Sequence, residues 1–473
     1  MNENKAFQWI FASGLALFIS LSFLTNGIGR EADSITHYLI SYYAPKHPYL
    51  FFDHWGKPFF TLLASPFAAL GFSWIKVFNT LQTFLSIWLI WKIGLQYRLK
   101  RLWMLPILIL VCPITWQVNF SGLTEPLFAS VLTFSVYLIL KNKASAGAIL
   151  VSFLPFVRSE GLLILVVFGL YFLIRKDWKN LALLASGHII MSLLGWPIQG
   201  ELLWVFTKIP YAHLNPIYGK GTWDHFLIQF HFMHGPIPYA LIILSIIFLI
   251  WYYRNKVIRE LFMNPYFYLV YGTSLAFFAA HTLFWALGIF GSMGLTRVFF
   301  GILPLLSLMM LDGWNELLDW IQFRKSALKN WVGGTLFGIM LVFPFLDNPA
   351  SFKLKRDLFL SNSAQGIKDE LAPWLEANRN EAHLLASDIS VCYFLNQDPF
   401  DSSSFSSPKL LMKFIQEKKQ GILVWDNWFT EVEDDLAPSR IDSLVKTGHL
   451  KEEKNWVWKN ENVNANYRIY RIQ

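Results

Sequence analysis

Apolar residues in this chain are gathered into long runs, which are separated by short segments rich in charge, Gly or Pro. A helix needs about 17–25 predominantly apolar residues to cross the hydrocarbon core of a bilayer. The pattern predicts spans at about residues 8–26, 74–95, 102–118, 122–140, 144–158, 160–174, 181–197, 236–253, 264–286, 296–312 and 331–346. No small-residue cleavage signature follows the first run, so we expect it to remain as an anchor.

Composition agrees with this pattern. Of the 473 residues, 54% are hydrophobic and 15% charged, against roughly 45–50% apolar and about 25% charged in soluble domains. We therefore expect an integral membrane protein, with the lipid bilayer as a partner. The two cysteines, Cys112 and Cys392, provide neither a disulfide framework nor a Cys-based metal site. Net charge is +8, but no RNA or DNA motif accompanies it, so no nucleic-acid partner is expected.

The basic residues favour one side of the predicted membrane part. With a cytoplasmic N-terminus, fifteen fall on the cytoplasmic side: Lys5, Arg98, Lys100, Arg101, Lys141, Lys143, Arg175, Lys176, Lys179, Arg254, Lys256, Arg259, Arg324, Lys325 and Lys329. Eight fall on the outer side: Arg30, Lys46, Lys57, Lys76, Arg158, Lys208, Lys220 and Arg297. The outer connections are nevertheless the longer ones, at about 27–73 and 198–235, and include amphipathic pieces suited to the membrane surface. The positive-inside rule supports this orientation.

Beyond residue 346 the composition changes. Residues 347–473 carry 16 basic and 19 acidic side chains, which indicates a soluble extracytoplasmic domain after a membrane domain of residues 1–346. Helical periodicity at 366–378 and 408–420, with short strands at 383–388, 421–426, 455–459 and 467–472, predicts a small α/β unit. Asp388 and Asp426 end two of these strands. Such positions often face a ligand, but capping of the next turn is the favoured interpretation.

Charged residues from separate segments converge on the outer face. The first outer connection contains Glu31, Asp33, Asp53, His54 and Lys57; Glu125 opens the fourth span, Arg158 and Glu160 lie at an outer turn, and Arg297 starts the tenth span. The second connection adds Glu201, Lys208, His213, Lys220, Asp224, His225, His231 and His234. Charge near a bilayer is costly and marks functional candidates. Within the spans the main polar candidates are His188 and His281, which we expect to be packing residues.

A lipid-linked phosphosugar fits such an outer site. Its tail stays in the bilayer, its phosphate lies at the interface, and its sugar points outward. Attack by a hydroxyl on the anomeric carbon needs a general base, which a carboxylate can provide, while the departing phosphate needs a fixed cation. Arginine suits phosphate because its planar fork pairs two oxygens.

Several short patterns resemble the GT-C fold glycosyltransferases, multispanning enzymes that use polyprenyl-phosphate sugars and include mannosyltransferases and aminoarabinose transferases. They are the acidic pair after the first span, "DHWGKPFFTLLASPFAALG", "LTEPLF", "RSEG" and "TRVFFGILPLL". The resemblance implies that Asp33 is the base, that Glu31 orients it, binds acceptor or shares a metal, and that Arg297 binds the donor phosphate. Val298 stands where the family usually has an aromatic residue. A divalent cation, Mg²⁺ or Mn²⁺, is left open.

Structural interpretations stand beside these roles. Arg158 and Glu160 can form a purely structural pair, Lys57 and His54 can snorkel at the interface, and Glu125 can be a first-turn residue favoured by the helix dipole. For Asp33 the alternative is an ordinary acid at a helix N-terminus.

Together these features predict an inverting glycosyltransferase of the cell inner membrane. It would transfer sugar from polyprenyl phosphate to a glycan, lipid or protein acceptor, and the C-terminal domain would help to bind the acceptor. Two alternatives remain: a polysaccharide polymerase or ligase that uses a diphosphate-linked donor, and a lipid-linked sugar transporter or flippase.

Overall fold

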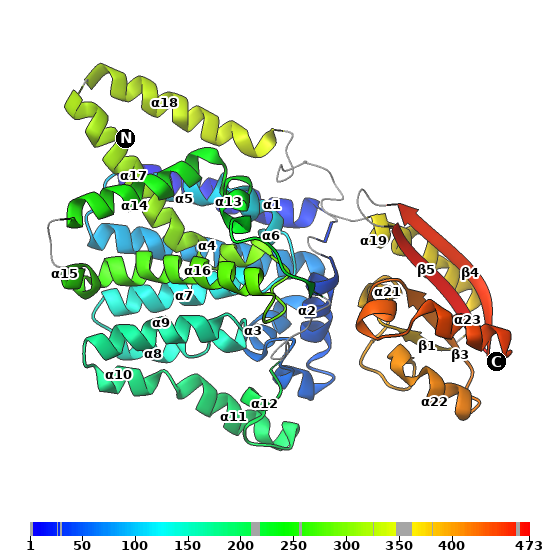
Figure 1. Ribbon diagram of the computed structural model, residues 1–473. Coiled ribbons are helices and arrows are strands. Elements are labelled where there is room, and N and C mark those ends of the chain that lie inside the picture. The colour runs from blue at the N-terminus through cyan, green and yellow to red at the C-terminus, as the bar shows by residue number, and fades with distance from the viewer. Residues whose placement is uncertain are drawn as a thin grey trace.

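A helical body and a smaller sheet-containing unit make up the protein. The computed structural model describes residues 3–25, 27–28, 31–209, 218–254, 258–324, 326–346, 362–380, 382–459 and 464–473. The long helices of the body run roughly alongside one another, and the C-terminal unit lies beyond one end of them (Figure 1). The mainly helical, multispanning class with a small C-terminal α/β unit is confirmed. The predicted boundary at residue 346 borders a segment, 347–361, that lies outside the described residues.

The helices of the body follow the predicted apolar runs. In chain order they are α1 (Glu3–Leu24), α2 (Glu31–Tyr43), η1 (Pro48–Phe52), α3 (Pro58–Ala68), α4 (Phe72–Gln96), α5 (Met104–Leu110), α6 (Pro113–Asn119), α7 (Glu125–Leu140), α8 (Ala144–Val151), η2 (Leu154–Phe156), α9 (Gly161–Ile174), α10 (Trp178–Leu183), α11 (Ser186–Gln199), α12 (Trp204–Thr207), α13 (His225–His234), α14 (Pro236–Tyr253), α15 (Ile258–Met263), η4 (Phe267–Gly272), α16 (Thr273–Leu287), η5 (Thr296–Ile302), α17 (Leu303–Arg324), α18 (Ser326–Val342) and η6 (Phe343–Phe345).

Length and composition single out the clearest spans. Within the described residues, five stretches are long and apolar enough to cross a membrane: Glu3–Leu24, Trp178–Gln199, Pro236–Tyr253, Phe267–Leu287 and Thr296–Gln322. The predicted span 102–118 differs, because it is two seven-residue helices, α5 and α6. Cys112 between them is extended, with ψ 124°, and the ring of Pro113 has no N–H with which to continue α5.

The helix α17 forms the centre of the body. Its residues from Leu303 to Leu311 are almost all buried and apolar, as expected for a helix surrounded by other helices. A β-carbon at Gly313 would collide with the backbone carbonyl of Leu241, so glycine permits the close approach of α14 to α17. This packing fixes η5, the short helix that precedes α17 and carries Arg297.

The C-terminal unit is a five-stranded mixed sheet covered on both faces by helices. The strands are β1 (His383–Ala386), β2 (Phe405–Ser406), β3 (Gly421–Asp426), β4 (Leu450–Lys459) and β5 (Asn464–Ile472), in the order β2-β1-β3-β5-β4. β1 pairs in parallel with β2 and β3, whereas β5 is antiparallel to β3 and β4. The helical elements are α19 (Asn362–Gly366), η7 (Ile367–Leu371), α20 (Ala372–Asn378), α21 (Ile389–Phe394), η8 (Pro408–Leu410), α22 (Leu411–Gln416), η9 (Phe429–Glu433) and α23 (Pro438–Lys446).

The sequence pattern located four of these five strands. Along β3, Ile422 and Val424 pack into one core with α20, while Leu423 and Trp425 pack into the other with α22 and α23. This alternation is the period of two expected for a strand. The two-residue strand β2 is too short to leave such a pattern and was not predicted.

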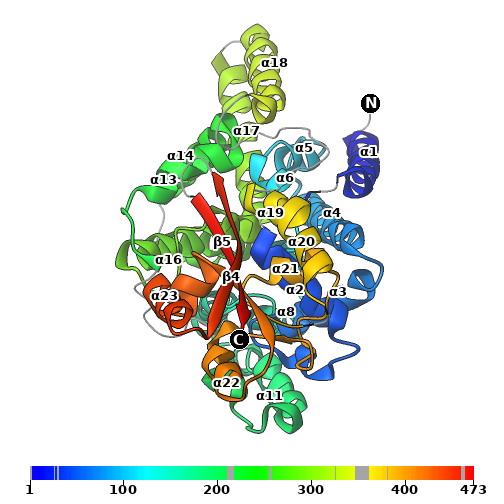
Figure 2. The same ribbon diagram turned by 90° about the vertical axis from the view of Figure 1, so that its right-hand side faces the viewer.

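The sheet unit docks on α2, the helix that carries Asp33. Asp398 lies 2.8 Å from both Lys46 and His47, just beyond α2. The Tyr393 ring contacts Tyr38 edge-on, with the ring centroids 5.8 Å apart. Viewed from this end, the sheet and its helices lie in front of α2 and α3 (Figure 2). These contacts fix the C-terminal unit relative to the end of the helical body.

Candidate active site

Five segments carry charge to the end of the body that faces the C-terminal unit. They are α2, the loop before α3, the start of α7, the turn between η2 and α9, and η5. In Figure 1, α2 and α3 lie at that end, whereas α15 lies at the opposite end. Segments more than 250 residues apart are thereby joined, since Arg297 binds Asp33.

An alternating chain of acids and arginines forms the centre of the site. Arg297 Nη2 donates to Asp33 Oδ2, and its Nε lies 3.3 Å from Glu125 Oε1. The same Glu125 oxygen lies 2.9 Å from Arg158 Nη1, and Arg158 Nη2 donates to Glu160 Oε1 at 2.7 Å. Glu125 therefore bridges two guanidinium groups.

Side-chain exposure rises along this chain from Glu125 through Arg297 to Asp33. The Glu125 side chain is 0% exposed, that of Arg297 11%, and that of Asp33 40%. Glu125 lies in the first turn of α7, where the helix dipole favours a negative charge. Thr124 beside it accepts a hydrogen bond from Arg158 Nη1 at 3.0 Å. Asp33 is thus the most exposed member of the chain.

Lys57 adds a third cation beside the chain. Its Nζ donates to Ser159 Oγ at 3.0 Å, and its backbone has a positive φ of 66°. Asp53 Oδ1 accepts from the Gly56 backbone N–H at 2.6 Å, which closes the loop that presents Lys57. Burial lowers the pKa of Lys57 to about 8, although the nearby Glu160 opposes the shift.

The pKa of Asp33 is set by two opposing effects. Burial raises the pKa, but the charge and hydrogen bond of Arg297 outweigh burial, so the pKa lies below its ordinary value. His37, one turn further along α2, packs against Trp55 with ring centroids 4.7 Å apart. Burial lowers its pKa to about 3, so it is neutral near pH 7. Asp33 is therefore ionised and the imidazole beside it uncharged.

Not every predicted residue joins this cluster. His54 Nε2 contacts the Val205 carbonyl oxygen at 3.2 Å, so it fixes α12 to the loop that contains Asp53. Lys208 lies 3.9 Å from Glu201, away from the chain. His225 Nε2 lies 3.1 Å from the Gly294 carbonyl oxygen, and His234 Nδ1 lies 3.1 Å from that of Phe230. The side chain of Glu31, and all of Arg30 and His213, lie outside the described residues.

The two span histidines pack against aromatic rings, although the buried Nε2 of His281 has no hydrogen-bond partner among the described residues; Asp388 and Asp426 cap turns. His188 stacks on Phe206 with centroids 5.2 Å apart, and His281 packs against Phe277 at 4.4 Å. Asp388 accepts from the Ser390 backbone N–H at 2.9 Å, while Asp426 accepts from three successive backbone N–H groups of η9. Their carboxylates cap the following turns, as predicted.

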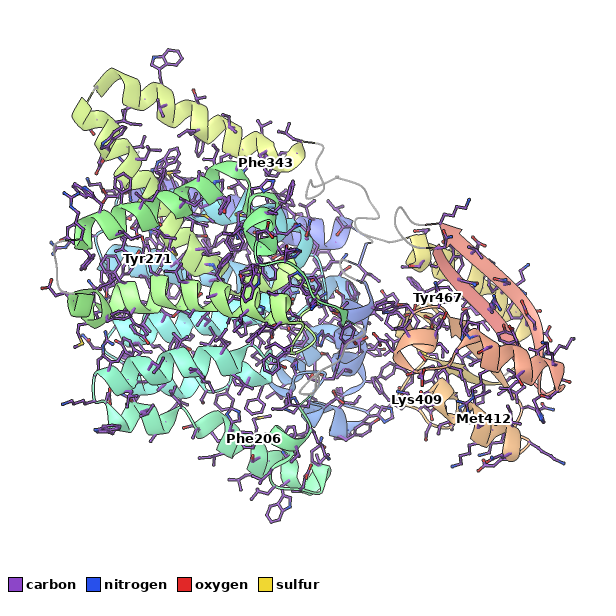
Figure 3. The ribbon with its side chains drawn as sticks, viewed as in Figure 1. Phe206, Tyr271, Phe343, Lys409, Met412 and Tyr467 are labelled. Carbon is purple, nitrogen blue, oxygen red and sulfur yellow. The ribbon has the colours of Figure 1, made fainter. Side chains whose placement is uncertain are left out.

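One intramembrane acid was missed. The predicted tenth span ends at Asp312, but α17 continues to Arg324, and within it this residue is half-buried. Tyr266 and Tyr271 each donate to its Oδ2 at 2.9 Å. Tyr271 lies in the part of the body away from the C-terminal unit (Figure 3). The available signal was the apolar run before "LDGWNELLD" and the Trp320, Ile321 and Phe323 side chains after it. The Asp312 network is separate from the outer chain.

Among the described residues, no group of three or more His, Cys, Asp and Glu side chains is placed to hold a metal ion.

Comparison with known proteins identifies the fold. No family model and no curated protein sequence match the chain. The crystal structure of ArnT from Cupriavidus metallidurans bound to undecaprenyl phosphate is similar, with a TM-score of 0.58, 12% identity and 97% coverage of each chain. ArnT in the apo state gives a TM-score of 0.56 at 13% identity, covering 99% of this chain and 98% of that chain. At this identity the likeness shows the fold alone, and the expected GT-C fold is confirmed.

Proposed function

We propose that this protein is a membrane glycosyltransferase that moves a sugar from a polyprenyl-phosphate donor to an acceptor hydroxyl, with inversion at the anomeric carbon. The observation that carries the proposal is the Asp33–Arg297 pair, anchored by the buried Glu125. The pair places a general base and a phosphate-binding cation side by side at one end of a membrane body. The undecaprenyl phosphate bound to the structurally similar ArnT supports the donor class.

In the proposed reaction, Asp33 accepts the proton of the acceptor hydroxyl as the hydroxyl oxygen attacks the anomeric carbon. The bond from that carbon to the phosphate oxygen breaks, and its electron pair leaves on polyprenyl phosphate. One displacement inverts the configuration and needs no covalent intermediate, so a single carboxylate suffices. Arg297 stabilises the negative charge that develops on the departing phosphate.

Binding of the donor would also activate the base. In the free protein Arg297 lowers the pKa of Asp33, which makes Asp33 a weak base. A donor phosphate that takes the guanidinium neutralises this cation, so the pKa of Asp33 rises when the donor is in place. Lys57, held 3.0 Å from Ser159, supplies further positive charge for the phosphate. Proton transfer is thereby coupled to occupancy of the donor site.

The proposed site faces outward across the cell inner membrane. Among the described residues, basic side chains assigned to the cytoplasm lie at the other end of the body, where Lys100 lies 2.6 Å from Asp319. Arg175 there donates to the backbone carbonyls of Phe262 and Met263, next to α15. The positive-inside rule then makes this basic end cytoplasmic. The active site and the C-terminal unit would be extracytoplasmic.

Transfer by the purified protein in liposomes tests the proposal. Labelled polyprenyl-monophosphate hexose should serve as donor, and the matching diphosphate should not. Arg297→Ala should raise the donor KM by at least 10-fold, because the group that binds the phosphate is lost. Arg440→Ala, on the exposed surface of α23, is the matched control. Transfer from the diphosphate alone, or an Arg297 effect confined to the acceptor KM, would contradict the proposal.

A further inference from the structure

The carboxylate of Glu433, in the C-terminal unit, lies close enough to Asp33 for the two charges to interact. Glu433 ends η9, and its Oε1 accepts a hydrogen bond from Tyr218 Oη at 3.4 Å. Burial raises the pKa of Glu433, and the negative charge of Asp33 raises it further. The two carboxylates therefore lie within electrostatic reach although they belong to different parts of the chain.

A rigid turn holds Glu433 in this place. The buried Asp426, at the end of β3, accepts from the backbone N–H groups of Trp428, Phe429 and Thr430 at 3.0, 2.7 and 3.2 Å. On the other side of Glu433, Asp434 lies 3.1 Å from Lys409. Lys409 lies on the side of the C-terminal unit that faces the helical body (Figure 3).

The two sides of Asp33 differ in charge. On its inner side Arg297, Arg158 and Lys57 provide cations, which suit a phosphate. Around Glu433, residues 429–435, "FTEVEDD", carry four acidic side chains, and this negative charge disfavours a phosphate or another anion. A donor phosphate therefore belongs on the inner side, and the acceptor must approach Asp33 from the side of Glu433.

The groups around Glu433 suit a sugar. A carboxylate accepts hydrogen bonds from hydroxyl groups, and the Tyr218 phenol can donate or accept one. Trp428, the residue before η9, is 41% exposed and can pack its ring against the apolar C–H face of a sugar. We propose that Glu433, Tyr218 and Trp428 form an acceptor subsite for the hydroxyl groups of a neutral glycan, shared between the membrane body and the C-terminal unit.

This inference rests on the proposed function and narrows its acceptor to a carbohydrate. Glu433 is an acceptor-binding residue, and the base remains Asp33. Loss of the carboxylate should therefore weaken acceptor binding and leave donor binding unchanged. A residue that served only to hold η9 in place would not separate the two substrates in this way.

Glu433→Ala in the full-length protein tests the subsite. We expect the acceptor KM to rise roughly 10- to 100-fold, the size of effect of losing a hydrogen bond to a charged group, with the donor KM within about twofold. Glu433→Asp should recover part of the loss. Asp435→Asn, an exposed change two residues away, is the control. An unchanged acceptor KM, or a rise in the donor KM, would overturn the subsite.

Direct binding keeps the two proposals separate. Isothermal titration of the full-length protein with a neutral hexose tetrasaccharide should give saturable binding, weakened at least 10-fold by Glu433→Ala and unaffected by Asp435→Asn. Absence of saturable binding, or equal binding by both variants, would overturn the subsite even in a protein that transfers sugar. Failure of the wild-type protein to use any monophosphate donor would instead remove the proposed function.

Discussion

Glu125 offers the sharpest test of how the charged chain is held together. Its carboxylate is fully buried and lies 2.9 Å from Arg158 Nη1 and 3.3 Å from Arg297 Nε. Glu125→Gln keeps the shape of the side chain but removes the charge that both guanidinium groups face. Removing one partner of a buried ion pair costs about 3–5 kcal/mol, and Glu125 faces two guanidinium groups, although Arg158 keeps Glu160 and Arg297 keeps Asp33 as partners. We expect a loss of stability of that size.

A second variant separates lost charge from lost packing. Replacing Glu125 by Leu together with Arg158 by Met removes both members of a pair and keeps apolar volume. Replacing a buried ion pair by apolar residues often leaves the free energy of unfolding nearly unchanged. In the double variant, however, Glu160 loses Arg158, its partner at 2.7 Å. We expect the double variant to unfold at a higher denaturant concentration than Glu125→Gln.

Unfolding in mixed detergent micelles, followed by tryptophan fluorescence against denaturant, measures both variants. Lys409→Ala, which affects an exposed ion pair of the C-terminal unit, provides a control expected to lose at most about 1 kcal/mol. A loss below about 1 kcal/mol for Glu125→Gln would refute the reasoning, because Glu125 would then not be compensating two buried cations.

Three further predictions concern the groups around the pair. Because burial lowers the pKa of Lys57 to about 8, Lys57 loses its charge above that pH, and kcat/KM for the donor should fall on the alkaline side. Lys57→Arg should extend the pH range over which kcat/KM is constant. An unchanged dependence of kcat/KM on pH in this variant would contradict the role of Lys57. A β-carbon at Gly122 would collide with the Ser34 carbonyl oxygen, so Gly122→Ala should shift α2 and lower the rate of sugar transfer at least 10-fold. A β-carbon at Gly338 meets nothing within 4 Å, so Gly338→Ala should leave the rate of transfer unchanged. Burial raises the pKa of Asp398, but the hydrogen bonds from Lys46 and His47 lower it below its ordinary value. Docking of the C-terminal unit on the helical body should therefore persist at pH 5 and weaken only as the pH falls through that lowered pKa. Asp398→Asn should increase hydrogen exchange in α21 at neutral pH.

The fold class could be predicted from the sequence because it follows from local patterns, and the sidedness of the site is a prediction that rests on patterns of the same kind. Apolar runs identify helices, and the positions of basic residues between them indicate which ends lie together. Glu125, Arg158 and Arg297 were candidates because each lies where a span meets an outer connection. The structure brings these three together and adds Asp33 to them.

The remaining features depend on contacts that local patterns do not contain. Nothing near Glu433 in the sequence indicates that η9 faces α2, since the docking relies on Tyr393 and Asp398 meeting residues hundreds of positions away. The break at Cys112 was hidden because the residues on both sides are apolar. The apolar pattern predicts a span that ends at Asp312, whereas the two tyrosine hydroxyls that hydrogen-bond to its carboxylate lie more than forty residues upstream.

Transfer by Asp33→Asn tests the central claim most directly. Purified wild-type protein and variant would be compared in liposomes with labelled polyprenyl-phosphate hexose and a neutral glycan acceptor, with thermal unfolding as the check on folding. If Asp33 is the base, the folded variant should bind the donor but lose at least about 100-fold in kcat, the range of general base catalysis. Transfer at the wild-type rate by a folded Asp33→Asn protein would contradict the assignment.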